Sequence, residues 1–126
     1  MTIVITGETP SKKNSRINTR SGRSFPSKRY TDWLDSALFQ LVDQIADFRR
    51  NGKLLAFERG LELTVTFYHG DLKRRDSDNQ LSSILDMLVD AQVIPDDNWE
   101  ILPVKHIFDA YDKGNPRCVI SLEPMK

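Results

Sequence analysis

Residues 61–89 read LELTVTFYHGDLKRRDSDNQLSSILDMLV, and this stretch decides most of the fold. From Leu61 to Phe67 apolar residues alternate with polar ones, which is the period-two pattern of a strand with one buried face. Later apolar residues follow the spacing of an amphipathic helix, and they are Leu81, Ile84, Leu85, Leu88 and Val89. We therefore expect a strand followed by a helix, with Ser77 or Asp78 available as the N-cap of the helix.

Similar patterns on either side predict the remaining elements. A second amphipathic helix is indicated by apolar residues at spacings of three and four, namely Leu34, Leu38, Leu41, Ile45 and Phe48. In chain order we expect a strand at 2–6, a loop at about 9–27, a helix at about 28–50 with Gly52 as its C-cap, a strand at 61–67, a helix ending near 91–93, a turn at 95–98, and strands at 101–108 and 117–122. This β-α-β-α-β-β order predicts an α+β fold in which both helices pack on a mainly antiparallel or mixed sheet.

Length and composition limit the class of protein. The chain has 126 residues, which fit one compact domain spanning 1–126. No apolar run approaches the ~20 residues that span a bilayer, and the N-terminus lacks a signal-peptide pattern, so we expect a cytoplasmic protein without a membrane segment. The single cysteine, Cys118, lies in a predicted strand, and we expect it to be a buried structural thiol.

The formal net charge is zero, but the charges are unevenly distributed. No acidic residue lies between Glu8 and Asp32, where seven cations occur: Lys12, Lys13, Arg16, Arg20, Arg23, Lys28 and Arg29. Seven acids follow later, and they are Asp71, Asp76, Asp78, Asp86, Asp90, Asp96 and Asp97. One stretch is suited to binding polyanions and the other to binding cations, although the basic stretch is equally consistent with a solvated loop.

Asp76 and Asp78 are the clearest candidates for a metal site. They are two residues apart, so in an extended backbone both carboxylates point to one side and can share a cation. Carboxylates without a paired His or Cys suit Mg²⁺ or Mn²⁺, metals that support phosphodiester hydrolysis. His69 and His106 have no ligand partner at a recognised spacing, so neither is assigned to the metal. Acids at a helix start are also selected for capping, so the pair alone does not establish a metal site.

A second acidic pair, Asp96 and Asp97, lies in the turn after the predicted helix. Asp96 follows Asp76 by 20 residues. The helix carries the chain away at about 1.5 Å per residue, so these acids reach Asp76 only through the tertiary fold or from another subunit. The sequence leaves both routes open.

Taken together, several motifs resemble the RusA family of Holliday-junction resolvases. The central ones are Arg74-Arg75-Asp76-Ser77-Asp78-Asn79, Leu85-Asp86-Met87-Leu88 and Val93-Ile94-Pro95-Asp96-Asp97. The likeness extends to Pro10-Ser11-Lys12-Lys13-Asn14-Ser15-Arg16 after the first strand and to Pro116-Arg117 before the last, so it covers most of the chain.

The resemblance implies a homodimeric, Mg²⁺-dependent endodeoxyribonuclease that binds branched DNA and cuts four-way junctions symmetrically in recombination and repair. Such a protein is expected to be nucleoid-associated when bound to DNA. Carried over by position, the catalytic and metal-ligating residues are Asp76, Asp78 and Asp97. Further candidates are Asp96, Asp86, Asn79 and Lys105. Asp86 matches a recurrent family aspartate, although its helical position predicts a solvent-facing side chain.

One position departs from the family pattern. Ser82 stands where the family usually has a lysine, four residues after the second aspartate. The candidates to replace that charge are Lys73, Arg74, Arg75 and Lys105. If none does, the protein binds junctions but cleaves them poorly.

The residues expected to contact DNA phosphates are the cations of the basic loop and those before the acidic pair: Lys12, Lys13, Arg16, Arg20, Arg23, Lys28, Lys73, Arg74 and Arg75. Phe25 is open between base stacking and packing, whereas Tyr30 is better explained as a core residue. Trp33 and Trp99 are interpreted as packing or dimer-interface residues.

Two other functions remain open at this point. A non-catalytic or weakly catalytic protein that binds structured DNA is motivated by Ser82. A nuclease acting on flaps or single strands is the other alternative, and it is distinguished by comparing branched, flapped and linear substrates.

Overall fold

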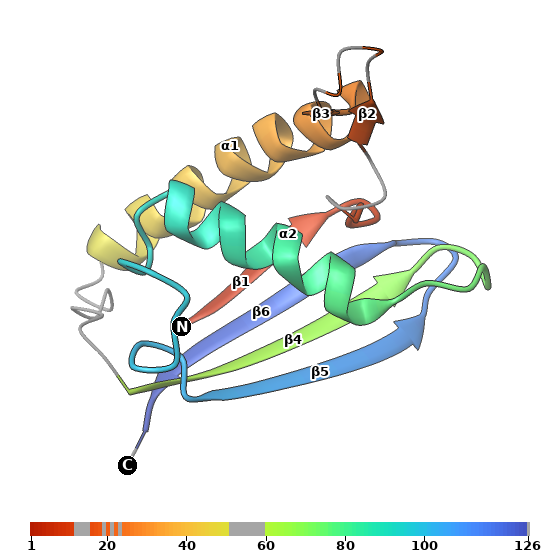
Figure 1. Cartoon of the computed structure of the whole chain (residues 1–126). Helices are drawn as coiled ribbons and strands as arrows, with labels where there is room; N and C mark the ends of the chain where they lie inside the picture. Colours follow the sequence, from red (N-terminus) through yellow and green to blue (C-terminus); the bar gives the residue numbers. More distant parts are fainter. Residues whose placement is uncertain (12–15, 19, 21, 23, 51–59, 126) are drawn as a thin grey trace.

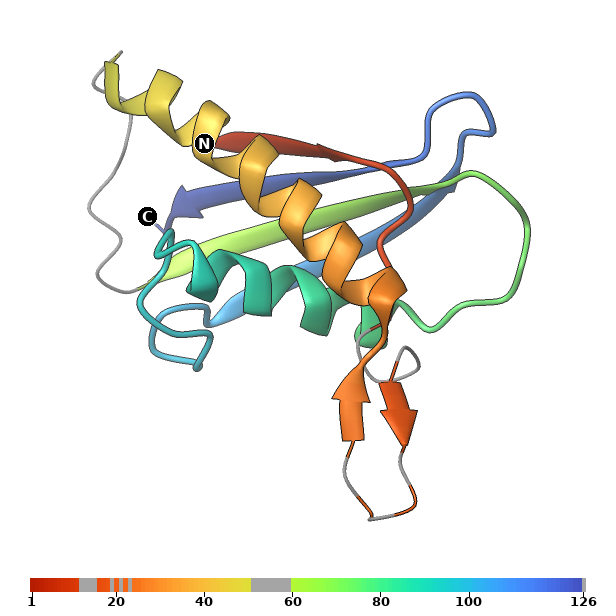
Figure 2. The same cartoon turned by 90° about the horizontal axis from the view of Figure 1, so that it is seen from above.

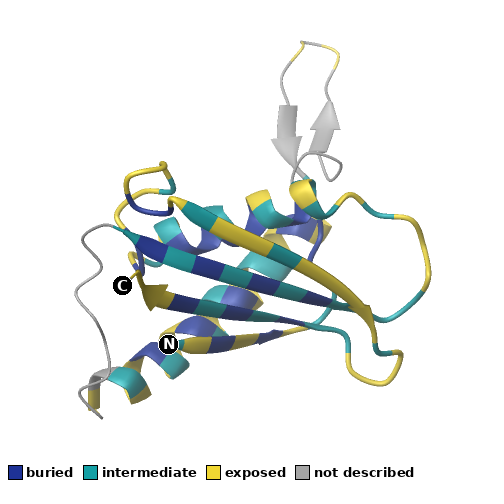
Figure 3. Cartoon of the chain, turned by 90° about the horizontal axis from the view of Figure 1, so that it is seen from below, coloured by how far each residue is buried: buried dark blue, intermediate teal, exposed yellow. Residues whose placement is uncertain are grey.

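The computed structural model describes residues 1–11, 16–18, 20, 22, 24–50 and 60–125; the side chains of 16–18, 24–26 and 49 are outside that description. Its elements are β1 (Thr2–Thr6), β2 (Arg16–Asn18), β3 (Ser24–Pro26), α1 (Lys28–Arg50), β4 (Leu61–His69), α2 (Ser77–Asp90), β5 (Val104–Tyr111) and β6 (Arg117–Pro124). Both helices lie on the same face of a four-stranded sheet (Figures 1 and 2), and Figure 3 views the opposite face.

The main sheet has the strand order β1-β6-β4-β5 and is mixed. β4 and β5 are parallel, whereas β6 is antiparallel to both β1 and β4. Helix α2 makes the crossover between the two parallel strands (Figure 1). The predicted α+β class, the mixed sheet and the two helices are therefore confirmed. Within the described residues, no helix combines the length and apolarity needed to cross a membrane.

The core lies between the sheet and the helices, where the periodicities of the sequence predicted it. On β4 the buried residues alternate with partly exposed ones, and on α1 Leu41 and Ile45 are buried. On α2 Ile84 and Leu88 are buried, and the other residues of the predicted stripe pack against the same cluster. Cys118 on β6 is fully buried, as expected, and burial raises the pKa of its thiol to about 12.

The predicted β-α-β-α-β-β order and the predicted start of one strand were wrong. The segment expected to be a continuous loop contains a two-stranded antiparallel hairpin of β2 and β3, whose strands have three residues each and therefore carry almost no periodic signal. β5 begins at Val104 rather than at 101, because the N–H groups of Ile101 and Leu102 both donate to the carbonyl of Asn98. These two residues form a turn that inserts their side chains into the core. Gly52, the expected C-cap, lies outside the described residues.

Helix α1 is anchored to the outer edge of β1 by two glutamine side chains. Gln44 accepts a hydrogen bond from the Val4 N–H at 2.9 Å and donates one to the Val4 carbonyl at 2.7 Å. Gln40 accepts from the Thr6 N–H at 2.9 Å. At the start of the helix Ser27 Oγ accepts from the Tyr30 N–H at 3.2 Å, as an N-cap does. These bonds fix the position of α1 along β1 and close its first turn.

Candidate metal centre and nucleic-acid interface

At the start of α2, the carboxylate of Asp76 has no hydrogen-bond or ion-pair partner among the described residues. Asp76 is the N-cap residue, with φ −97° and ψ 110°, but its side chain makes no capping hydrogen bond. Its backbone carbonyl instead accepts from the N–H groups of Asn79 and Gln80. The expected cap, Ser77 or Asp78, is thus wrong by one or two residues. Because Asp76 does not cap with its side chain, capping does not account for this carboxylate, and both Asp76 and Asp78 are exposed.

Ser77, between the two acids, is tied to the sheet by a chain of polar side chains that we call the Glu8–Ser77 relay, made of Glu8, His69, Asp109 and Ser77. Ser77 Oγ donates to Asp109 Oδ2 at 2.5 Å, and His69 Nε2 lies 2.7 Å from Asp109 Oδ1. His69 Nδ1 lies 3.0 Å from Glu8 Oε2. Burial acts to lower the pKa of His69, but the hydrogen bonds to Asp109 and Glu8 outweigh it, so the pKa is raised.

Arg75 forms ion pairs within the protein. Its guanidinium donates to both carboxylate oxygens of Asp71, at 2.7 and 3.1 Å, and lies 3.3 Å from Glu8. The hydrogen bond to Asp71 raises the pKa of Arg75, and the same bond lowers the pKa of Asp71 to about 2. The two ion pairs brace the segment that leads from β4 to the acidic motif.

Two further bonds bring the base of the basic loop beside α2. The buried side chain of Gln80 donates from Nε2 to the Thr9 carbonyl at 2.7 Å, and Ser83 Oγ donates to the Pro10 carbonyl at 2.7 Å. Each bond joins residues more than 70 positions apart. The sequence features suited to polyanions and to cations are therefore adjacent at this point.

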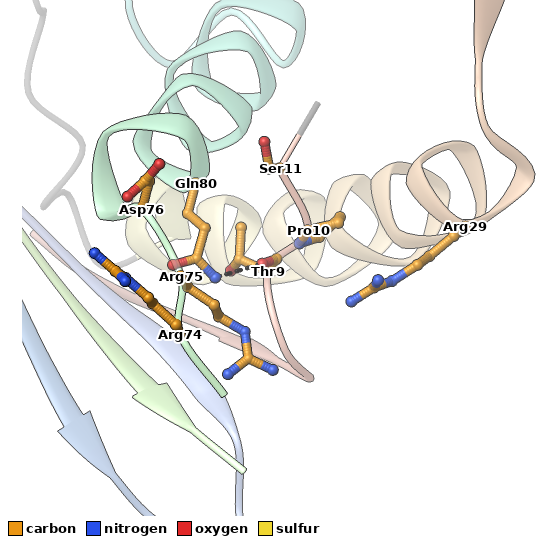
Figure 4. A pocket seen from close by; sticks show the side chains of 8 residues that line it. All are labelled: Thr9, Pro10, Ser11, Arg29, Arg74, Arg75, Asp76 and Gln80. Carbon is orange, nitrogen blue, oxygen red and sulfur yellow. Dashed lines mark hydrogen bonds between the residues drawn. The ribbon is translucent and has the colours of Figure 1, made fainter. Parts of the chain in front are cut away.

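A hollow of about 380 Å³ opens where these segments meet (Figure 4). It is lined by Thr9, Pro10, Ser11, Arg29, Arg74, Arg75, Asp76 and Gln80. Arg29 extends from α1 toward the hollow from the side opposite Arg74 and Asp76 (Figure 4). An acid and three guanidinium groups from two segments of the chain thus line one concavity.

The other acidic pair lies at the opposite end of α2. This helix has 14 residues, so its ends are separated by about 21 Å. Asp96 Oδ1 accepts the Asp97 N–H at 2.7 Å and Oδ2 accepts from the Asn98 side chain at 3.3 Å, which closes the turn. Asp97 is partly buried. Among the described residues, no group of three or more His, Cys, Asp or Glu side chains is arranged to hold a metal ion. One chain therefore does not bring Asp97 to Asp76 and Asp78.

The secondary candidates occupy varied positions. Asn79 is in the first turn of α2, and Asp86 is partly buried, not fully solvent-facing as expected. Lys105 donates to the Leu102 carbonyl at 2.7 Å and precedes Asp109 by four residues on β5, a separation of about 13 Å. Lys105 is thus distant from the start of α2. Ser82 is exposed and donates to the carbonyl of Asp78 at 3.4 Å, within its own helix.

The predicted DNA-contacting cations are described only in part. Lys12, Lys13 and Arg23 lie outside the described residues, as does the side chain of Arg16. Those that are exposed are Arg20, Lys28, Lys73 and Arg74.

Two of the predictions for the aromatic residues are confirmed, whereas Trp99 does not pack within the chain and its predicted place in a dimer interface stays a prediction. Tyr30 is buried, as expected, and Trp33 packs against the core. Trp99, beside the Asp96–Asp97 turn, is 76% exposed, and the side chain of Phe25 lies outside the described residues.

Comparison with known proteins gives one similar protein. No family model matches the chain. The chain is 29% identical over 117 residues to a curated protein of Aquifex aeolicus (strain VF5) named crossover junction endodeoxyribonuclease RusA. The match covers 91% of this chain and 84% of the relative. This similarity supports membership of the RusA family. The resemblance expected from the acidic motifs is therefore confirmed.

Sequence reasoning missed four residues of the site region. Glu8, His69 and Asp109 come from three different strands or their ends, and no spacing relates them. Arg29 was counted among the basic residues but was not assigned a contact. The one sequence signal for a DNA contact by Arg29 was its place directly after Lys28, at the start of the helix that follows the basic loop.

Proposed function

We propose that the protein is a Mg²⁺-dependent endodeoxyribonuclease, with Mn²⁺ as an alternative metal, that binds and symmetrically cleaves four-way DNA junctions in recombination and repair. The observation that carries the proposal is the Asp76 carboxylate, which has no partner among the described residues and faces a hollow lined by arginines. The similarity to a crossover junction endodeoxyribonuclease supports the junction as substrate. A DNA substrate would place the protein at the nucleoid.

Asp76 and Asp78 are the proposed metal ligands of each chain. Their donor atoms are all carboxylate oxygens and both side chains are exposed, which suits a hard divalent cation. A bound Mg²⁺ supplies polarisation of the phosphoryl oxygen and a more acidic water. Ser77, held by Asp109, orients the backbone between the two ligands. Arginines in the hollow neutralise the phosphodiester that lies beside them.

Asp97 is proposed to complete the site from a second copy of the chain. Its distance from Asp76 along α2 argues against a shared ion within one chain, and a twofold dimer would place two equivalent sites on a symmetric junction. Each site would then combine Asp76 and Asp78 of one copy with Asp97 of the other.

Two alternatives differ from this proposal in catalytic power or in substrate. The exposed, uncharged Ser82 favours a protein that binds structured DNA and cleaves weakly or not at all. A flap or single-strand nuclease would use the same acids, and it is distinguished by its preference among branched, flapped and linear substrates.

The deciding experiment incubates the protein with a four-way junction assembled from synthetic strands, with Mg²⁺ and with EDTA. Paired symmetric nicks that need Mg²⁺ and disappear in Asp76→Asn are expected. Binding without nicks, or equal cleavage by wild type and Asp76→Asn, contradicts the enzyme assignment. Flapped and linear DNA of the same sequence, at the same salt concentration, serve as substrate controls.

A complementation experiment tests whether the site is shared between copies. Asp76→Asn and Asp97→Asn chains are unfolded together, refolded and assayed as a mixture. If Asp97 acts on the other copy, mixed dimers regain one intact site and nick one strand of the junction. If all three acids act within one chain, every site in the mixed dimer carries a defect and no activity returns.

A further inference from the structure

The hollow beside Asp76 contains guanidinium groups of two kinds. Arg75 is partly buried and paired with Asp71 and Glu8, as described above. Arg29 and Arg74 are exposed, and within the described part of the chain neither has a hydrogen-bond or ion-pair partner. The three arginines therefore differ in availability although all of them line the same concavity.

The wall of the hollow carries an independent sign of a binding site. Gln80 is 2% exposed, and its amide oxygen Oε1 has no hydrogen-bond partner among the described residues. Its amide nitrogen is already used by Thr9, so the unpaired atom is the acceptor. An unsatisfied buried acceptor costs about 1–3 kcal/mol, and such atoms are found where a ligand or an ordered water completes the structure.

The backbone of Arg29 is held in place by contacts of α1 that do not involve the Arg29 side chain. The helix that carries it is fastened to β1 through Gln40 and Gln44 and is capped by Ser27. Tyr30, the next residue, is buried in the core. Only the end of the Arg29 side chain must therefore be ordered when an anion binds.

We propose that this hollow binds one phosphodiester of the DNA backbone, and that Arg29 and Arg74, which have no ion pair among the described residues, bind it. This inference rests on the proposed function for the identity of the polyanion. Opposed guanidinium groups each present paired N–H donors that match phosphate oxygens. A water ordered by the phosphate would donate to Gln80 Oε1.

The first test compares arginine variants by fluorescence anisotropy, with labelled junction and EDTA to prevent cleavage. Arg29→Gln is expected to weaken binding roughly tenfold, as the loss of a charge-assisted contact does. It should also reduce the slope of log K against log salt by about one. Arg50→Gln is the matched control, because it removes the same charge from the far end of the same helix, where Arg50 pairs with Asp47. Equal binding by the two variants overturns the proposal.

The second test identifies the phosphate. Junctions carrying one neutral methylphosphonate at successive positions around the cleavage point are bound by wild type and by Arg29→Gln. If Arg29 contacts a single phosphate, the penalty of Arg29→Gln disappears at one position and persists at the others. A penalty that is the same at every position contradicts a defined phosphate site.

Failure of the phosphate site can be distinguished from failure of the proposed nuclease function. If wild type does not cleave junctions but Arg29→Gln binds junction and linear duplex more weakly than Arg50→Gln does, the phosphate site stands and the nuclease proposal fails. If wild type cleaves junctions and the two variants bind alike, the phosphate site fails alone. Arg29→Lys, which keeps the charge but loses the paired donors, is expected to retain part of the affinity.

Discussion

The two ends of α2 each present a pair of aspartates, but the surrounding backbone uses them differently. At the start, the capping bonds come from the carbonyl of Asp76, and neither Asp76 nor Asp78 has a side-chain hydrogen bond among the described residues. At the far end, Asp96 holds the turn together and Asp97 does not. The four acids look alike in the sequence but differ in the structure. The Asp96 carboxylate is used by hydrogen bonds of its own turn, whereas those of Asp76, Asp78 and Asp97 remain available to a ligand.

The largest effect is expected for one of the two acids that follow α2, Asp96 and Asp97. Asp97→Ala should lower the rate of junction cleavage by about 100-fold or more, since losing even an outer partner of a metal ligand costs 10- to 100-fold. Its free energy of unfolding should change by less than about 0.5 kcal/mol. Asp96→Ala should cost about 1–2 kcal/mol of stability with less than about a threefold change in rate. Nicking rates and urea unfolding of both variants check the comparison, and a reversed pattern would assign the ligand role to Asp96.

A smaller effect is expected from the serines near the start of α2. Ser77→Ala removes the bond to Asp109 and should slow cleavage roughly tenfold, with binding of the junction unchanged. Ser82→Ala is the matched control, because its hydroxyl contacts only its own helix and its removal should leave the rate within about twofold. Single-turnover cleavage with saturating enzyme separates the rate from affinity. Equal rates for the two variants would show that the Glu8–Ser77 relay does not position the acids.

Ser82→Lys adds a charge one helical turn after Asp78. Because Arg29 and Arg74 are expected to supply positive charge to the hollow, the gain in cleavage rate should be about threefold or less. The same single-turnover assay measures it. A gain of one hundredfold would mean that the start of α2 lacks a cation.

The smallest expected effect is a pH-dependent loss of stability when His69, at the end of β4, is replaced. The pKa of His69 is raised in the folded protein, so its protonated form is the one that folding favours. This stabilisation is fully present below the unfolded pKa of about 6.5 and is lost as pH rises through the higher folded value. His69→Gln should therefore reduce the free energy of unfolding more at about pH 5.5 than at about pH 9, by on the order of 1 kcal/mol. Urea unfolding at the two values measures this difference, and a deficit that does not depend on pH would contradict it.

Elements with a long periodic pattern could be predicted from the sequence. The bounds of β1 and α1 agree with the expected ranges, and the acidic motif was found without any coordinates. The hairpin of β2 and β3 was not predicted, because three residues per strand are too few for a period to be recognised. The start of β5 was misplaced because Ile101 and Leu102 have the composition of a strand but fill the core from a turn.

The residues of the candidate site also divide into those that the sequence predicts and those that only the structure shows. Asp76, Asp78 and Asp97 were found from residue type and spacing, which local sequence contains. The contacts of Glu8 with His69, 61 positions later, and of Ser77 with Asp109 depend on which strands become neighbours. Arg29 could not be ranked above Lys28, since both are adjacent cations and only the packing of α1 determines which of them lines the hollow.

The sequence by itself determined the periodic elements, the α+β class, and a set of acids whose side chains suit a hard cation. Helical and strand periods are local properties, so neighbouring residues are sufficient to show them. Only the tertiary structure decided that the Asp76 side chain makes no capping hydrogen bond and that Arg75 forms internal ion pairs. It also decided that Arg29 lines the hollow beside Asp76. These properties depend on contacts between segments distant in the chain. The packing of those segments sets which side chains are buried, which charges form ion pairs and where each side chain points.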